Sequence, residues 1–158
     1  MSAKDELLDQ KLQVSKTITI EASPEVVFRA LVNSEEVTKW FQDEVTLEPK
    51  VGGKVRFVCL KDKHSEKQLD RDYINEGIIK EFVPNRKLAY TWKFNDLPDF
   101  PETLVVWELE EIEPNKTRVK LNHTGFTGKE TGMTSLENHE KGWTELIKKL
   151  AKYCTGNK

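Results

Sequence analysis

Six runs of alternating apolar and polar residues between residues 44 and 124 constrain the fold of this chain most. They cover Glu44–Glu48, Lys54–Leu60, Tyr73–Val83, Lys87–Asn95, Glu102–Glu111 and Thr117–Thr124. Such alternation is typical of half-buried strands. The connections are mostly short, and two contain a Pro-Asn turn (Pro84-Asn85 and Pro114-Asn115). Because parallel neighbours need a crossover of a dozen or more residues, these connections predict an antiparallel meander.

One more strand and two short helices are predicted ahead of the meander. Lys16–Glu21 alternates with period two and is rich in β-branched residues, which favours a strand. Ser23 is a good N-cap, and Pro24 suits the first position of a helix. A second short helix is expected to start at Asn33 or Ser34 and to close with Trp40-Phe41. The sheet should therefore have seven strands, with both helices between the first strand and the second.

The chain ends in an amphipathic helical pattern. Its apolar residues recur at helical spacing and are Trp143, Leu146, Ile147, Leu150, Ala151 and Cys154. A single apolar stripe predicts that this helix packs on one face of the sheet. We therefore expect an α+β fold in which a curved antiparallel sheet wraps around the long C-terminal helix. One helix rarely fills the whole concavity of such a sheet, so a cavity is expected beside it.

Charge and hydropathy exclude several classes of partner. The net charge is −2, so no large positive field is available to bind a nucleic acid. No apolar run is long enough to cross a membrane, and Met1–Gln13 lacks the apolar stretch of a secretory signal. The two cysteines could form at most one disulfide, and their low number favours reduced thiols. We therefore expect a cytoplasmic protein without nucleic-acid or membrane partners.

Short motifs along most of the chain resemble one known family. They are Ile18–Pro24, Val27–Leu31, Trp40–Phe41, Val51–Gly53, Gly77, Pro84–Leu88, Tyr90–Trp92, Val105–Leu109, His123–Phe126 and Gly142–Trp143. Together they resemble the family named for the activator of heat-shock-protein-90 ATPase, which belongs to the START-like (SRPBCC) superfamily. The resemblance runs in unbroken order from about residue 15 to residue 154.

The resemblance implies a helix-grip fold, usually without a bound metal or nucleotide, so we expect no cofactor. Residues 15–155 are expected to form a single START-like domain and residues 1–14 an N-terminal extension. Similar proteins include chaperone activators, binders of hydrophobic metabolites and antibiotic-sequestering proteins, so the resemblance leaves the activity open. Chaperone activators typically carry an additional N-terminal domain. Only about fifteen residues precede the first strand here, which counts against the full co-chaperone role.

Aromatic residues on the predicted strands are the main candidates for a ligand site. Trp92 shares a strand face with Tyr90, and Trp107 lies on one face of the next strand. If these faces are concave, they form either a stacking wall for an apolar ligand or, as such patterns more often do, a plain core. Glycines around Phe126 suggest a gate over one entrance. The candidate ligand-binding residues are Phe57, Tyr90, Trp92, Trp107, His123, Phe126, His139 and Trp143.

Two histidines raise the question of catalysis. His123 lies near the end of the last strand and His139 one turn before Trp143, so both could face one pocket mouth. Such a pair could act in acid–base chemistry or, with Glu137 or Glu140, bind a metal. Their spacing matches no compact metal motif, and we favour hydrogen-bonded histidines at a helix–sheet junction. No nucleophile motif is present, so we predict neither catalytic nor metal-binding residues.

Three functions remain open. The leading hypothesis is a protein that binds a small hydrophobic or aromatic molecule in an internal cavity without catalysis. The alternative is a chaperone accessory that interacts with a heat-shock ATPase or another protein. The third is an enzyme that uses His123 or His139.

Overall fold

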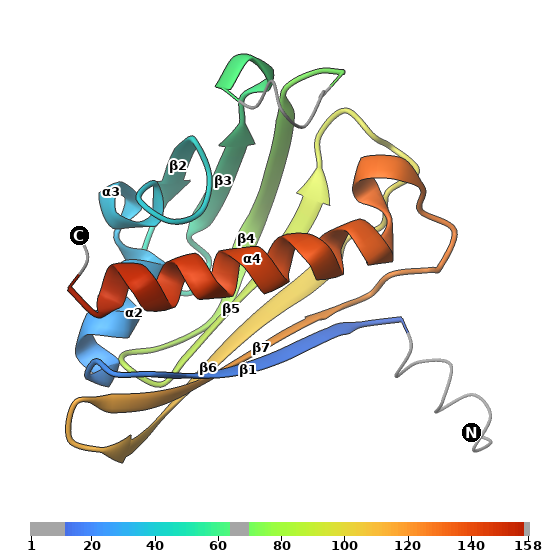
Figure 1. Cartoon of the computed structure of the whole chain (residues 1–158). Coiled ribbons are helices and arrows are strands. Elements are labelled where there is room, and N and C mark those ends of the chain that lie inside the picture. Colours follow the sequence, from blue (N-terminus) through green and yellow to red (C-terminus); the bar gives the residue numbers. More distant parts are fainter. Residues whose placement is uncertain (1–11, 64–69, 157–158) are drawn as a thin grey trace.

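The computed structural model describes residues 12–63 and 70–156 and confirms the predicted α+β helix-grip fold (Figure 1). The strands are β1 (Val14–Ile20), β2 (Glu44–Leu47), β3 (Lys54–Cys59), β4 (Tyr73–Val83), β5 (Lys87–Phe94), β6 (Thr103–Glu113) and β7 (Lys116–Thr124). They form one antiparallel sheet in the order β1-β7-β6-β5-β4-β3-β2. β2 to β7 follow one another as the predicted meander, and β1 pairs with β7.

The two Pro-Asn turns set the tight hairpins of the meander. Between β4 and β5 the Arg86 N–H donates to the Val83 carbonyl at 3.0 Å, which closes the turn. Asn85 and Asn115 adopt φ values of 65° and 60°. Asparagine tolerates this left-handed region better than most residues, and a turn with proline at its second position often requires it at the third. The sequence thus predicts both turns correctly.

Three α-helices and two 3₁₀ turns complete the described chain. They are α2 (Pro24–Val32), α3 (Ser34–Val37), α4 (Leu136–Cys154), η1 (Lys61–Lys63) and η3 (Gly132–Thr134). Side-chain oxygens cap the α-helices: Ser23 accepts from Val26 N–H at 3.3 Å and Ser135 from Asn138 N–H at 3.0 Å. α3 is shorter than expected and ends at Val37, and the chain continues through turns to Trp40.

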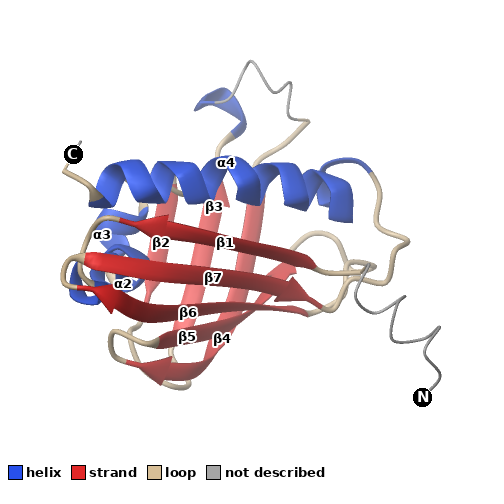
Figure 2. Cartoon of the chain, turned by 60° about the horizontal axis from the view of Figure 1, so that its bottom comes forward, coloured by secondary structure: helices blue, strands red, loops and turns tan. Residues whose placement is uncertain are grey.

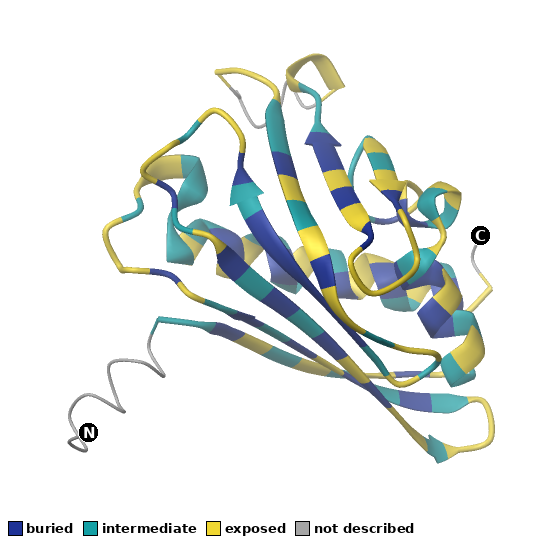
Figure 3. Cartoon of the chain, turned by 180° about the vertical axis from the view of Figure 1, so that it is seen from behind, coloured by how far each residue is buried: buried dark blue, intermediate teal, exposed yellow. Residues whose placement is uncertain are grey.

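α4 crosses the concave face of the sheet, as Figures 1 and 2 show. Along most strands buried residues alternate with intermediate or exposed ones (Figure 3), as expected of a sheet with one face in the core. Glu76, Lys80 and Glu108 are exposed, so these three charges lie outside the core. The core occupies the layer between sheet and helix, and any internal site must lie there.

The N-terminal extension expected at residues 1–14 falls mostly outside the described residues. Its last residue, Val14, is already part of β1 and pairs with His123. Among the helices of the described residues, none has the length and apolar character needed to cross a bilayer.

Candidate functional site

All eight candidate residues are buried in the core, none more than 8% exposed. Trp92 of β5 lies at the centre of this aromatic cluster. Its ring centroid is 5.5 Å from Phe57, 5.8 Å from His123 and 6.1 Å from Trp143. These are normal distances for packed aromatic pairs. The cluster joins β3, β5 and β7 to α4.

His123 is held by hydrogen bonds on both ring nitrogens. The indole N–H of Trp143 donates to Nδ1 at 3.0 Å, so Nδ1 carries no proton and Nε2 does. Nε2–H lies 2.7 Å from the Thr103 hydroxyl oxygen, which in turn donates to the Trp92 carbonyl at 2.7 Å. Each donor in this series of hydrogen bonds finds an acceptor only if His123 carries its proton on Nε2. His123 is therefore neutral and fully hydrogen-bonded.

His139 has the opposite tautomer for the same reason. The indole N–H of Trp92 donates to its Nε2 at 3.3 Å, which leaves the proton on Nδ1. Nδ1–H then donates to the Ser135 carbonyl at 2.9 Å, within the first turn of α4. The two imidazole rings lie 5.3 Å apart, so the structure brings both histidines together as expected. This is the arrangement favoured from the sequence, hydrogen-bonded histidines at a helix–sheet junction.

Burial favours the neutral form of both rings. It lowers the pKa of His123 well below the usual histidine range, and the nearby His139 lowers it further. Burial also lowers the pKa of His139, although hydrogen bonding to Ser135 opposes part of this shift. A proton added to either ring would point at an indole N–H. Neither histidine is thus set up to exchange protons with a substrate.

We expect the protein to lose stability as the pH falls below about 6.5, the histidine pKa in an unfolded chain. Below that pH the unfolded state binds more protons than the folded state, whose histidines have lowered pKa values. The free energy of unfolding should fall by up to about 1.4 kcal/mol per pH unit for each histidine. Urea denaturation at pH 7.5 and pH 5.5 measures this loss.

The matched control for this prediction is His139→Gln, because a glutamine carbonyl can still accept from Trp92. This variant should show about half the pH dependence of the wild type. Equal stability of the wild type at both pH values would contradict the assignment of two buried, neutral imidazoles.

A cavity of about 120 Å³ remains between α4 and strands β3 to β5. It is lined by Phe41, Gln42, Cys59, Tyr73, Asn75, Trp92, Phe94, Met133, Asn138, His139, Gly142, Trp143 and Leu146. Three candidate residues, Trp92, His139 and Trp143, line it. The lining is mostly aromatic and apolar, so the cavity is suited to an apolar ligand.

The other five candidates do not line the cavity. Phe57 and His123 pack against Trp92, and Tyr90 accepts a hydrogen bond from the Trp107 indole at 3.3 Å. Phe126 is only 4% exposed and packs 4.6 Å from His123. Phe126 therefore lies in the core in this structure, and the gate expected there stays a prediction.

Several cavity residues were missed in the sequence analysis. Phe41 follows α3 and stacks parallel to Trp92 at 6.0 Å. Asn75 is 3% exposed on β4, between Phe57 and Phe94 of the neighbouring strands. Gly142 adjoins Trp143 on α4 and leaves space where a side chain would otherwise stand. Two sequence signals could have found these residues. They are the strand parity of Asn75 and the occurrence of Gly142 within the helical pattern.

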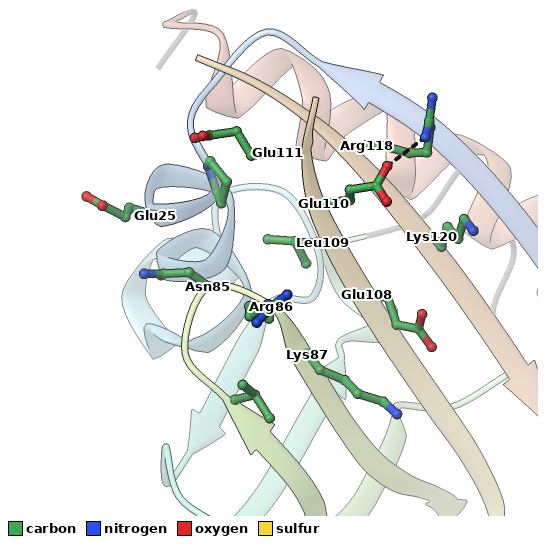
Figure 4. A pocket seen from close by; sticks show the side chains of 12 residues that line it. Glu25, Asn85, Arg86, Lys87, Glu108, Leu109, Glu110, Glu111, Arg118 and Lys120 are labelled. Carbon is green, nitrogen blue, oxygen red and sulfur yellow. Dashed lines mark hydrogen bonds and ion pairs between the residues drawn. The ribbon is translucent and has the colours of Figure 1, made fainter. Parts of the chain in front are cut away.

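A second, larger hollow of about 740 Å³ lies on the outside of the sheet (Figure 4). It is lined by Pro24, Glu25, Val83, Asn85, Arg86, Lys87, Glu108, Leu109, Glu110, Glu111, Arg118 and Lys120. Arg118 pairs with Glu110 at 2.7 Å, and both side chains are largely exposed. A charged surface groove binds apolar molecules poorly. We therefore take the smaller, mainly apolar cavity between α4 and the sheet as the candidate ligand site.

Metal ligands do not gather anywhere in the described part of the chain. Within residues 12–63 and 70–156, no group of three or more His, Cys, Asp or Glu side chains could hold a metal ion.

Solved structures share this fold at low sequence identity. A protein from Chromobacterium violaceum superposes with a TM-score of 0.76 at 19% identity, covering 91% of this chain and 97% of its own. An Hsp90 activator from Plasmodium falciparum has a TM-score of 0.71 at 23% identity, with coverage of 92% and 96%. DynU16, a protein in the dynemicin biosynthetic locus, has a TM-score of 0.71 at 19% identity and coverage of 93% and 48%.

These identities show a common fold and no more. The chain spans about half the length of DynU16. No curated protein matched the sequence. A family model gave the decisive match: the model described as "Activator of Hsp90 ATPase homolog 1-like protein" matches residues 21–155. The chain therefore belongs to the family of Activator of Hsp90 ATPase homolog 1-like proteins, within the START-like superfamily.

Proposed function

We propose that this protein binds a small apolar or aromatic molecule in the cavity between α4 and β3 to β5. The observation that carries the proposal is the cavity of about 120 Å³, whose lining is mostly aromatic and apolar. A dry apolar cavity of about 150 Å³ in another protein holds benzene, so a single aromatic ring is the appropriate ligand size. Larger ligands would require the rings around Trp92 to move.

The lining supplies the contacts that such a ligand needs. Trp92 and Trp143 come from the sheet and the helix, and their ring centroids lie 6.1 Å apart. Phe41 and Phe94 each pack against Trp92, at 6.0 Å and 6.1 Å. A flat ligand placed among these rings can stack on them and lose its apolar surface from water. Binding of this kind requires no catalytic group.

Binding is favoured over catalysis by the state of the two histidines. Both ring nitrogens of His123 and His139 already have hydrogen-bond partners. A general base needs a nitrogen within hydrogen-bond reach of its substrate, and using either ring would break this network. The histidines are better suited to fixing the orientation of Trp92 and Trp143 than to chemistry.

Filling the cavity is expected to abolish binding. Gly142 lines the cavity, and a Cβ at this position meets no atom within 4 Å. In Gly142→Leu the new side chain can extend over the cavity, and the affinity for toluene should fall at least tenfold, about 1.4 kcal/mol. Toluene binding can be followed by the shift of the Trp92 and Trp143 indole N–H signals in NMR spectra.

Gly142→Ala is the matched control because it adds one carbon at the same site. It should retain most of the affinity for toluene. The proposed function would be contradicted if toluene did not shift the indole signals of the wild type. It would also be contradicted if Gly142→Leu bound toluene as tightly as the wild type.

A chaperone-accessory role is the second candidate. It is supported by the family description and by the fold shared with the Plasmodium falciparum Hsp90 activator. The charged groove on the outer face offers a polar surface of the kind seen in protein contacts (Figure 4). Adding the protein to a purified Hsp90 and measuring ATP turnover tests this role. Unchanged turnover would remove it.

A further inference from the structure

We infer that the cavity selects a ligand that carries a hydrogen-bond donor, and that Asn75 recognises this donor. The inference rests on the proposed function and names the class of ligand: a small aromatic or apolar molecule with one hydroxyl or N–H group. Asn75 lines the cavity and is 3% exposed. Within the described residues, its Oδ1 is the single buried side-chain oxygen or nitrogen that lacks a hydrogen-bond partner.

The position of Asn75 makes this unpaired oxygen unusual. Asn75 lies on β4 directly across from Phe57 on β3 and Phe94 on β5. Directly opposed residues point to the same face of a sheet, so the amide lies between two aromatic side chains on the concave face. Asparagine is depleted in strands, and a buried acceptor without a donor costs free energy. An apolar residue would serve the core better, so a core role does not explain Asn75.

Three donors near Asn75 are already used within the protein. The indole N–H of Trp92 donates to His139, and that of Trp143 donates to His123. The Tyr73 hydroxyl, two residues along β4, donates to Asp70 at 2.6 Å. None of these three donors is therefore available to Asn75. With these three donors in use, a molecule inside the cavity can supply the donor that Oδ1 lacks.

The Asn75 side chain can reach such a molecule without rearranging the backbone. The terminal torsion of an asparagine side chain is broad, so rotation about it can turn Oδ1 toward the cavity. A ligand hydroxyl or N–H would then donate to the amide oxygen while the ring stacks on Trp92 and Trp143. A mainly apolar pocket with one polar anchor is a common arrangement for small-ligand specificity.

Phenol, toluene and anisole separate the contributions of ring and donor. Phenol and toluene have nearly the same shape, but only phenol can donate a hydrogen bond, and anisole can only accept one. The wild type should bind phenol at least tenfold more tightly than toluene or anisole. The indole N–H signals of Trp92 and Trp143 report binding of all three molecules.

Asn75→Leu is the matched variant because leucine has a similar shape and no polar atoms. It should bind phenol at least tenfold more weakly than the wild type and bind toluene at least as well. Because the variant removes an unpaired acceptor, its ligand-free thermal midpoint should rise by about 2–4 °C. This rise shows in the same experiment that the variant folds.

The outcomes separate the two proposals. If neither phenol nor toluene binds the wild type, the proposed function fails and the inference fails with it. If toluene binds but phenol binds no more tightly than toluene and anisole do, or if Asn75→Leu leaves the phenol affinity unchanged, only the recognition by Asn75 is overturned.

Discussion

Trp143→Ala is expected to lower the free energy of unfolding by about 3–5 kcal/mol. Trp143 is 2% exposed and packs against Phe41, Trp92 and Trp107. Its removal enlarges the existing cavity and leaves Nδ1 of His123 without its donor, so the cost of lost packing and the cost of an unpaired buried nitrogen add. Chemical denaturation of wild type and variant measures the difference.

The hole left by Trp143→Ala should itself bind a ligand. Indole has the size and the N–H of the missing side chain, so saturating indole should raise the thermal midpoint of the variant more than that of the wild type. Trp143→Phe keeps an aromatic ring but loses the N–H, so its stability should lie between those of the wild type and Trp143→Ala. A Trp143→Ala protein as stable as the wild type would contradict the view that this residue closes the aromatic cluster.

Gly77→Ala is expected to destabilise the protein by at least about 3 kcal/mol. A Cβ at residue 77 would lie 1.8 Å from the carbonyl oxygen of Thr91 on β5. The neighbouring N–H of Ile78 donates to the Thr91 hydroxyl at 2.8 Å, so β4 and β5 are held close at this point. The methyl group would force the two strands apart where they carry Asn75 and Trp92 toward the cavity.

The control for Gly77→Ala lies in the same chain. At Gly142 a Cβ meets no atom within 4 Å, and alanine favours helix over glycine by about 1 kcal/mol. Gly142→Ala should therefore raise the free energy of unfolding, measured by urea denaturation of both variants. Wild-type stability in Gly77→Ala would show that β4 and β5 can separate there at little cost.

Local signals predicted the fold well because each depends on few neighbours. The alternation of apolar and polar residues shows which residues share a strand face, and the Pro-Asn turns at Asn85 and Asn115 fix the hairpins. Short connections leave antiparallel pairing as the only solution for most of the sheet. The length of α3 was harder to predict, because turns through Trp40 continue the helical pattern without a full set of helical hydrogen bonds.

The site was predicted only in part. Parity grouped Trp92 with Tyr90 on one strand face and left open which face is concave, and the structure buries both Trp92 and Trp107. Helical spacing placed His139 and Trp143 on the apolar stripe of the last helix, which is also buried. A cavity is the volume that remains after packing, and it depends on the rotamers of side chains from several elements. Sequence patterns do not contain that information. Phe41 and Asn75 therefore escaped notice, while Tyr90 and Trp107 were singled out although they do not line the cavity.

The most direct test of the proposed ligand site is a crystal structure of the protein grown with phenol. We expect electron density for the ring in the cavity between α4 and β3 to β5, in contact with Trp92 and Trp143. A cavity that remains empty, or phenol bound only elsewhere on the protein, would contradict the proposal that this space is a binding site.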